Sequence, residues 1–248
     1  MTLRTIQKLV LLALLTTSAS IFADDTSSST SKYFGGWYGG VQLGGGRNEA
    51  KITDKDGWDH GDNDQCGSTT PCSFKINGSG GLAGLVIGYD HIVGSQLIGL
   101  LAEGSISNID ANKLTNLDSG VTPTYTIKSE INGLGSLRAK YGYTKDKFAI
   151  FVTGGLGFAD TTSKFKDVYD PSDRDRDSNI FDHSKFNAGT VYGIGAAFAV
   201  TEASNISIDY SRYNFNSSSD YKIGTTSYSF GVKDIEVETA KITYVIKF

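Results

Sequence analysis

Apolar residues alternate with small or polar residues in several separate segments of the chain. A period of two is typical of β-strands whose two faces meet different surroundings. Eight segments of this kind lie near residues 37–47, 80–90, 96–109, 125–143, 147–160, 186–200, 205–215 and 233–248. The pattern therefore predicts an all-β chain with eight strands.

The connections between these segments alternate strictly between short and long. Three are short, at residues 91–95, 144–146 and 201–204. Four are long and polar, at residues 48–79, 110–124, 161–185 and 216–232. Such an order is expected when consecutive strands run up and down, with turns on one side of a membrane and loops on the other. We therefore predict an eight-stranded antiparallel up-and-down transmembrane β-barrel with short periplasmic turns and long extracellular loops.

The last segment shows the two predicted faces most clearly. One face carries Ala240, Ile242, Tyr244, Ile246 and Phe248, and the other carries Thr239, Lys241, Thr243, Val245 and Lys247. A lysine or arginine on the lipid face of a barrel costs about 2 to 4 kcal/mol at the bilayer midplane. The charge-free face therefore predicts contact with outer-membrane lipid. Arg212 is the exception among the apolar faces, and we expect it at the rim or beyond a bulge.

Aromatic residues gather beside the predicted short turns. They are Tyr38, Tyr89, Tyr141, Tyr143, Tyr244 and Phe248. Aromatic rings suit the interface between lipid and water, so these residues predict a girdle. The alternative is the ordinary preference of aromatic residues for strands.

The opposite faces of the strands carry three acidic and three basic residues. They are Glu103, Glu130, Asp209, Arg138, Lys140 and Lys241. An eight-stranded barrel is about wide enough for side chains to fill its interior. We therefore predict that these six side chains form a polar network that plugs the barrel interior, with Glu103, Arg138, Asp209 and Lys241 at similar depth. A gated ion path is the alternative.

Composition agrees with export of the chain. Only 39% of the residues are hydrophobic, and no run approaches the roughly 18 apolar residues of a membrane helix. Residues 1–23 are predicted to be a signal peptide, residues 24–35 a disordered lead, and residues 36–248 the barrel domain. Loss of Arg4 and Lys8 with the signal would leave 21 basic against 27 acidic residues, a formal charge of −6 that disfavours nucleic acid as a partner.

The candidates for special chemistry are few. Cys66 and Cys72 share a polar stretch of an exported chain, so we predict a disulfide between them, with two free thiols or a metal site as alternatives. His183 next to Ser184 could support hydrolysis, although a solvated loop histidine is the simpler interpretation. The Asp-rich stretches at 54–64 and 170–177 do not fit the EF-hand register. We predict no catalytic residue, no metal and no cofactor.

Several segments also carry a family resemblance. They are GGWYGGVQLGGG at 35–46, LAGLVIGYD at 82–90, LIGLLAEGSIS at 97–107, GSLRAKYGY at 135–143, FVTGGLGF at 151–158 and the terminal KITYVIKF. Together they resemble the OmpA-type, porin-like outer-membrane β-barrel proteins, in particular the small surface-antigen barrels of Gram-negative bacteria. The chain departs from the family pattern at Val86, where a polar lumen residue is expected. It also departs at DYSRY (209–213), which has one residue more than the EYRY that often occurs in this segment.

The resemblance implies a place in the cell outer membrane and a C-terminal signal, formed by Tyr244, Ile246 and Phe248, that the barrel-assembly machinery reads. We expect a monomeric, structural, surface-exposed barrel whose interaction loops contact host or surface ligands, as an adhesin or surface antigen. The alternative is a narrow porin or channel for small solutes. An outer-membrane barrel enzyme ranks third.

Overall fold

The computed structural model describes residues 31–54, 72–115, 125–167, 179–222 and 229–248. The eight strands are β1 (Gly36–Asp54), β2 (Cys72–Val93), β3 (Gln96–Thr115), β4 (Tyr125–Lys145), β5 (Phe148–Asp167), β6 (Asn179–Ala199), β7 (Ser204–Lys222) and β8 (Ser229–Lys247). One short helix, α2 (Ser31–Phe34), precedes them. Within the described residues no helix has the length and apolar character needed to span a membrane.

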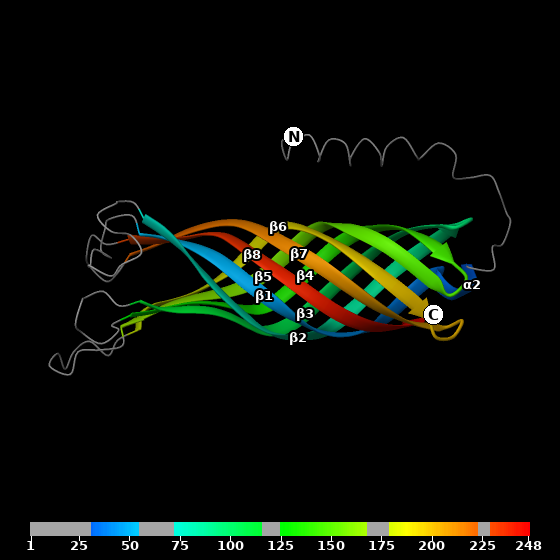
Figure 1. Cartoon of the computed structure of the whole chain (residues 1–248), viewed down its shortest axis with the longest axis horizontal. Helices are drawn as coiled ribbons and strands as arrows, with labels where there is room; N and C mark the ends of the chain where they lie inside the picture. The colour runs from blue at the N-terminus through cyan, green and yellow to red at the C-terminus, as the bar shows by residue number, and fades with distance from the viewer. Residues whose placement is uncertain (1–30, 55–71, 116–124, 168–178, 223–228) are drawn as a thin grey trace, which may run out of the picture.

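The strands form a closed barrel in chain order, and β1 completes it by pairing with β8 (Figure 1). Every neighbouring pair is antiparallel. The prediction of an eight-stranded antiparallel up-and-down barrel is therefore confirmed. The short turns at 94–95, 146–147 and 200–203 share one end of the barrel with α2, and we call this the turn end. The opposite end is the loop end.

The strands are longer than predicted, and all except β4 continue further toward the loop end. They have 19 to 22 residues, whereas about 9 to 11 suffice to cross a bilayer. Residues 48–54 of β1, for example, fall in a stretch predicted to be a loop. Asn48, Ala50 and Ile52 are buried there while Glu49 and Lys51 are more exposed, so the period of two persists. The prediction of loops was wrong for these parts because many polar residues on the outer face masked the alternation.

The barrel opens into two sheets toward the loop end. Pairing between β2 and β3 ends at Gly78–Ala111, and pairing between β6 and β7 ends at Thr190–Asn214. Beyond these points β7, β8, β1 and β2 remain paired as one sheet, and β3, β4, β5 and β6 as another. Figure 1 shows the strands gathering in two groups at this end. We call the two-sheet part the extension and the closed part the membrane half.

The two parts place their apolar side chains on opposite sides. A buried cluster fills the space between the sheets of the extension and reaches the closed part; it contains Ala50, Ile52, Phe74, Ile76, Leu82, Ile109, Ala111, Ile127, Ile131, Leu134, Ala159, Val191, Tyr213, Phe215, Val232, Ile235 and Val237. On the membrane half, large apolar residues are instead exposed on the outside of every strand. This apolar band includes Leu43, Leu85, Leu100, Leu137, Ile150, Ile194, Ile208 and Ile242.

The start of the described chain differs from the predicted disordered lead at 24–35. Its last part forms α2, which is ordered because Phe34 packs against Leu97, Ala149 and Ala199 at the turn end. The Lys32 ammonium forms an ion pair with Glu202 of the last turn, at 2.8 Å. The predicted signal peptide and the rest of the lead lie outside the described residues.

Candidate functional site

A network of charged side chains crosses the interior of the membrane half, and Glu103 of β3 lies at its centre. Lys241 of β8 donates to both carboxylate oxygens of Glu103 at 2.7 Å, and Arg138 of β4 reaches Oε2 at 2.8 Å. The side chains of these three residues are only 2 to 3% exposed. The Tyr213 hydroxyl donates to Oε1 of Glu103 at 2.7 Å. Glu103 thus links three strands through the lumen.

Asp209 of β7 extends the network to the other side of Arg138. The Arg138 Nη1 atom lies 3.2 Å from Oδ2 of Asp209, and the Ser211 hydroxyl donates to the same oxygen at 2.6 Å. Lys241 lies 3.6 Å from Oδ1 of Asp209. The structure therefore brings together the four residues that were predicted to lie at similar depth: Glu103, Arg138, Asp209 and Lys241.

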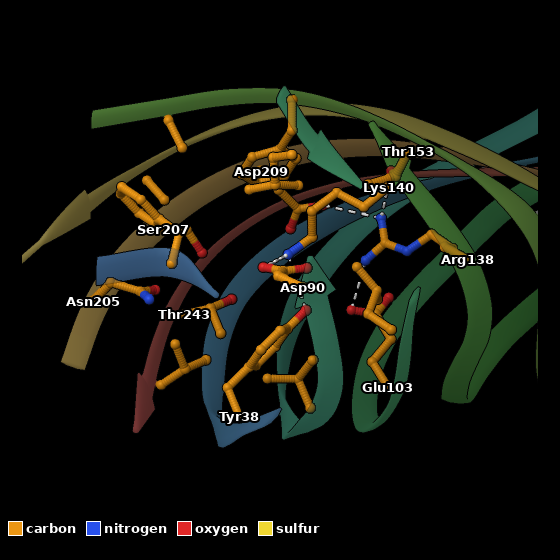
Figure 2. A pocket seen from close by; sticks show the side chains of 18 of the residues that line it. Tyr38, Asp90, Glu103, Arg138, Lys140, Thr153, Asn205, Ser207, Asp209 and Thr243 are labelled. Carbon is orange, nitrogen blue, oxygen red and sulfur yellow. Dashed lines mark hydrogen bonds and ion pairs between the residues drawn. The ribbon is translucent and has the colours of Figure 1, made fainter. Parts of the chain in front are cut away.

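Lys140 belongs to a second group closer to the turn end. Its ammonium donates to Asp90 at 2.8 Å and to the Tyr38 hydroxyl at 2.9 Å (Figure 2). It also lies over the Tyr38 and Phe151 rings, at 4.7 and 5.2 Å from their centroids. Sequence reasoning missed Asp90, although its position shares a face with Val86 on β2 and so predicts a lumen side chain.

Tyr38 corrects the predicted aromatic girdle. Trp37 is 54% exposed on the outside, whereas Tyr38, the next residue, is 5% exposed and faces the lumen. The Tyr38 ring packs with Val86, Leu101 and Val245. This contact also explains why an apolar residue stands at position 86. The remaining predicted girdle residues Tyr89, Tyr141, Tyr143, Tyr244 and Phe248 are exposed.

Glu130 does not join the lumen network, which corrects the prediction. The register of β4 shifts between Ile131 and Gly133, where Asn132 is an extra residue against β5. A bulge of this kind reverses the faces of the strand beyond it. Ser129 and Ile131 are therefore buried, and Glu130 instead contacts Lys128 at 2.5 Å and Lys164 at 2.9 Å.

The lumen of the membrane half is electrically balanced. Asp90, Glu103 and Asp209 face Arg138, Lys140 and Lys241 through contacts of 2.7 to 3.6 Å. Removal of one partner from a buried ion pair typically costs about 3 to 5 kcal/mol, because the other charge is left uncompensated. The arrangement therefore acts as a structural cross-brace that occupies the lumen.

A cavity of about 50 Å³ lies beside this network toward the turn end. Asn205, Ser207 and Thr243 line it opposite Asp90, and Phe34 of α2 also contributes to its wall (Figure 2). The volume suits a few water molecules. It is far below the roughly 300 to 1,000 Å³ of sites for drug-sized ligands.

Aromatic rings of the buried cluster cover the network toward the loop end. The Tyr213 and Phe215 rings are stacked with centroids 6.1 Å apart. Gly157 and Gly189 leave room for them, since a Cβ atom at either position would come within 2.9 Å of a ring atom. The ion network and the apolar cluster therefore follow one another along the lumen.

Other predicted residues lie on the outside or beyond the described part. Arg212 is on the outer face of β7 and forms ion pairs with Glu236 and Glu238 of β8. Tyr244, Ile246 and Phe248 share the exposed outer face, and the Phe248 amide donates to the Trp37 carbonyl at 3.1 Å. Their recognition by the assembly machinery stays a prediction.

The remaining chemical candidates are only partly accessible to description. Cys66 lies outside the described residues, so the disulfide with Cys72 stays a prediction. The side chain of His183 is likewise outside the described part. Within the described residues, no group of three or more His, Cys, Asp or Glu side chains is placed to hold a metal ion.

Comparisons with known proteins agree with this architecture. Residues 9–233 match the family described as outer membrane protein beta-barrel domain. A search of curated proteins found no match. Among solved structures, the chain is similar to the attachment invasion locus protein Ail of Yersinia pestis, with 12% identity, a TM-score of 0.37, and coverage of 86% of this chain and 99% of that chain.

Two further structures are similar at the same level. OprG of Pseudomonas aeruginosa has 15% identity and a TM-score of 0.39, with 86% of this chain and 99% of that chain covered. The outer membrane protease OmpT of Escherichia coli has 9% identity and a TM-score of 0.48, with 86% and 96% covered.

Proposed function

Because the chain belongs to the outer membrane protein beta-barrel domain family and therefore lies in the cell outer membrane, we propose that it is a structural, surface-exposed barrel whose loop end binds molecules at the cell surface. The observation that carries the proposal is the extension. Its strands continue well past the apolar band as two packed sheets, so they end at a distance from the lipid. Loops on a rigid scaffold are the usual carriers of binding function.

The filled lumen favours this role over that of a channel. Glu103 and Asp209 together neutralise Arg138 and Lys241 across the interior, and the stacked Tyr213 and Phe215 rings follow toward the loop end. An ion would have to displace paired charges and then pass an apolar layer. Purified protein in planar bilayers is expected to give no stable conductance, and a large stable conductance would establish the channel instead.

The binding role is tested on intact cells. Cells that carry the protein are expected to attach to host-cell surfaces or matrix coatings more strongly than cells without it. Brief surface proteolysis should abolish this gain, with cuts in the four connections at the loop end and none in the short turns. Attachment that is unchanged by the protein would refute the binding role, and cuts in the turns would invert the topology.

An enzymatic role has one candidate constellation, His183 next to Ser184 on β6. The proposal assigns the pair no catalysis. If the purified barrel turns over lipid or peptide and His183→Ala abolishes this turnover, the assignment is overturned. If the natural protein shows no turnover, the assignment is supported.

A further inference from the structure

The β6 strand has an open edge toward the loop end. It pairs with β5 as far as Asn179, but its pairing with β7 runs only from Ala199 to Thr190. In the part of the chain that the structure describes, no strand lies against β6 on its β7 side beyond Thr190. An open edge presents a row of backbone donors and acceptors to a passing chain.

Two hydrogen bonds at the turn end reveal which residues present these groups. The Ala199 amide donates to the Lys147 carbonyl at 2.8 Å, and the Val200 amide donates to the Ser204 carbonyl at 2.9 Å. In an antiparallel sheet, alternate residues direct both backbone groups to the same neighbour. Odd-numbered residues of β6 therefore bond to β5, and even-numbered residues face β7.

This alternation continues to the open edge, because the register between β5 and β6 is unbroken from Phe148–Phe198 to Phe165–Phe181. The amide and carbonyl groups of Ser184, Phe186 and Ala188 therefore point into the gap beside β6. They form a regular row with one donor and one acceptor at every second residue.

Phe186 provides an apolar contact on the outer face beside these backbone groups. Phe186 is 69% exposed and stacks on Phe158, with ring centroids 5.8 Å apart and planes at 17°. Ser184 and Ala188 flank it and are also exposed. Aromatic and β-branched residues in cross-strand contact stabilise a strand pair, so Phe186 offers an anchor beside the open edge.

The open edge lies beyond the lipid. Pairing of β6 with β7 stops at Asn214, just past Arg212, which forms ion pairs with Glu236 and Glu238 on the outer face. Phe186 lies opposite Asp160 of β5. Open sheet edges do not occur against hydrocarbon, and these charges mark where water replaces it.

We propose that the edge of β6 formed by Ser184, Phe186 and Ala188 binds an extended polypeptide segment of another protein as an added β-strand. The inference rests on the proposed surface-binding role and names the chemistry of the partner. The partner contributes backbone groups at every second residue and a β-branched or aromatic side chain against Phe186. A row of alternating donors and acceptors is complementary to peptide backbone, which is the basis of strand addition in known complexes.

The first test is amide hydrogen exchange of the full chain, folded in detergent. The Ser184, Phe186 and Ala188 amides are expected to exchange quickly, while the Asn187 and Gly189 amides, which bond to β5, exchange slowly. Protection of the three even-numbered amides in the monomer would show that the chain itself already covers the edge, and would overturn the proposal. Protection that appears only with rising protein concentration would identify a second copy as the occupant, which also overturns it.

The second test uses a labelled eight-residue peptide of alternating threonine and valine, with fluorescence anisotropy as the readout. The peptide is expected to bind and to protect the Ser184, Phe186 and Ala188 amides. The same peptide with alternate amides N-methylated should bind at least tenfold more weakly. Absent binding, or equal binding of both peptides, would overturn strand addition.

Matched variants locate the binding to the edge. Ala188→Pro removes an amide that faces the gap and is expected to weaken peptide binding at least tenfold, whereas Ala188→Gly keeps the amide and should change it little. Phe186→Ser should weaken binding several-fold, and Phe198→Ser, at an exposed aromatic of the closed part, should not. Heat-modifiable gel mobility verifies that each variant is folded. Unchanged binding by folded Ala188→Pro would contradict the proposal.

The whole-cell assay separates this inference from the proposed function. Attachment that Ala188→Pro reduces as strongly as surface proteolysis does would support both. Attachment that persists with Ala188→Pro but is lost on proteolysis would overturn the role of the edge alone. Attachment that never depends on the barrel would refute the proposed function as well.

Discussion

The membrane half and the extension are built from the same strands, yet they are inverted with respect to each other. On β8 the apolar Ile242 is 61% exposed and Lys241 faces the lumen, whereas four residues earlier Val237 is fully buried and Glu238 lies outside. The strand keeps its phase between these positions, since Val237, Thr239 and Lys241 are all buried. The medium outside therefore decides which chemistry each face carries.

The two parts also differ in what holds their interiors together. The extension has water outside, so burial of its apolar inner faces is favourable, at roughly 25 cal/mol per Å². The membrane half has lipid outside, which is as apolar as its own outer side chains. Its interior is instead braced by ion pairs such as Glu103–Lys241, and its strands are held by hydrogen bonds that leave no edge in the hydrocarbon.

The largest effect is expected from breaking the brace of the membrane half. Glu103→Gln would leave Arg138 and Lys241 buried with one carboxylate, Asp209, between them. We expect the free energy of unfolding to fall by about 3 to 5 kcal/mol, as for other buried ion pairs that lose one partner. Urea titration in detergent, followed by heat-modifiable gel mobility, measures the change.

An ion pair of the extension provides the matched control. Glu49 contacts Lys75 at 2.5 Å on the outer face, where both side chains reach water. Glu49→Gln should leave the unfolding midpoint nearly unchanged, because exposed pairs contribute little. If the two substitutions had equal effects, the lumen network would not be the brace that we describe.

Next in size is truncation within the extension. Ile235 of β8 is 2% exposed in the buried cluster between the sheets. Ile235→Ala is expected to cost about 2 to 5 kcal/mol, because it removes buried methyl groups and leaves a cavity. Amide exchange in the outer parts of β1 and β8 should accelerate more than exchange in the membrane half.

The lipid-facing counterpart sharpens this result. Ile208 of β7 is exposed on the apolar band, so Ile208→Ala should have a much smaller effect. Similar losses at both positions would contradict the view that apolar burial stabilises the interior of the extension and not the outer face of the membrane half.

Much of the barrel could be predicted from alternation alone. A period of two fixes which residues share a face, so the amino-acid order is enough to assign Glu103, Arg138, Asp209 and Lys241 to one interior. The alternation of short and long connections predicts the up-and-down topology, because consecutive strands must reverse direction. Both arguments depend only on local geometry and hold as long as the phase is kept.

The predictions that failed depend on information that is not local. Alternation without a bulge predicts Glu130 inside the barrel. The extra residue Asn132 reverses the faces of β4 beyond it, and the composition gives no clear sign of this bulge. The extension was predicted to be loops because its apolar residues face inward and its polar residues face the surrounding water. This is the reverse of the pattern expected for a membrane-spanning barrel strand. Alternation alone places Asp90 on the lumen face of β2, but the contacts of Asp90 and Tyr38 with Lys140 could not be predicted because these residues are distant in the chain.

A third prediction concerns the boundary between the two media. Ile242→Lys would place an ammonium on the apolar band and is expected to cost about 2 to 4 kcal/mol near the midplane. Asn77→Lys makes a lysine on the exposed outer face of β2 in the extension and should cost little. Urea unfolding in lipid vesicles measures both. A tolerated lysine at 242 would mean that this face does not contact lipid.

The smallest effect is expected at the turn end, where α2 is held to the barrel. The hydrogen bond between Lys32 and Glu202 lowers the pKa of the Glu202 carboxyl and raises the pKa of the Lys32 ammonium. Because the carboxyl pKa is lowered, the contact is fully stabilising at any pH above the ordinary pKa of glutamate. It is lost as the pH falls through the lowered pKa of Glu202. The contact should therefore be intact at neutral pH and weaken below about pH 4.

Two features limit the size of this response. Both groups are exposed and so are screened by salt, and a second hydrogen bond, from the Lys247 ammonium to the Lys32 carbonyl at 2.6 Å, does not depend on Glu202. A fluorophore on Ser31→Cys, with the natural cysteines replaced by serine, should lose some anisotropy between pH 6 and pH 3. Glu202→Gln should show the lower value at both pH values. A pH response that persists in Glu202→Gln would assign the titration to another group and leave this contact without a role in holding α2.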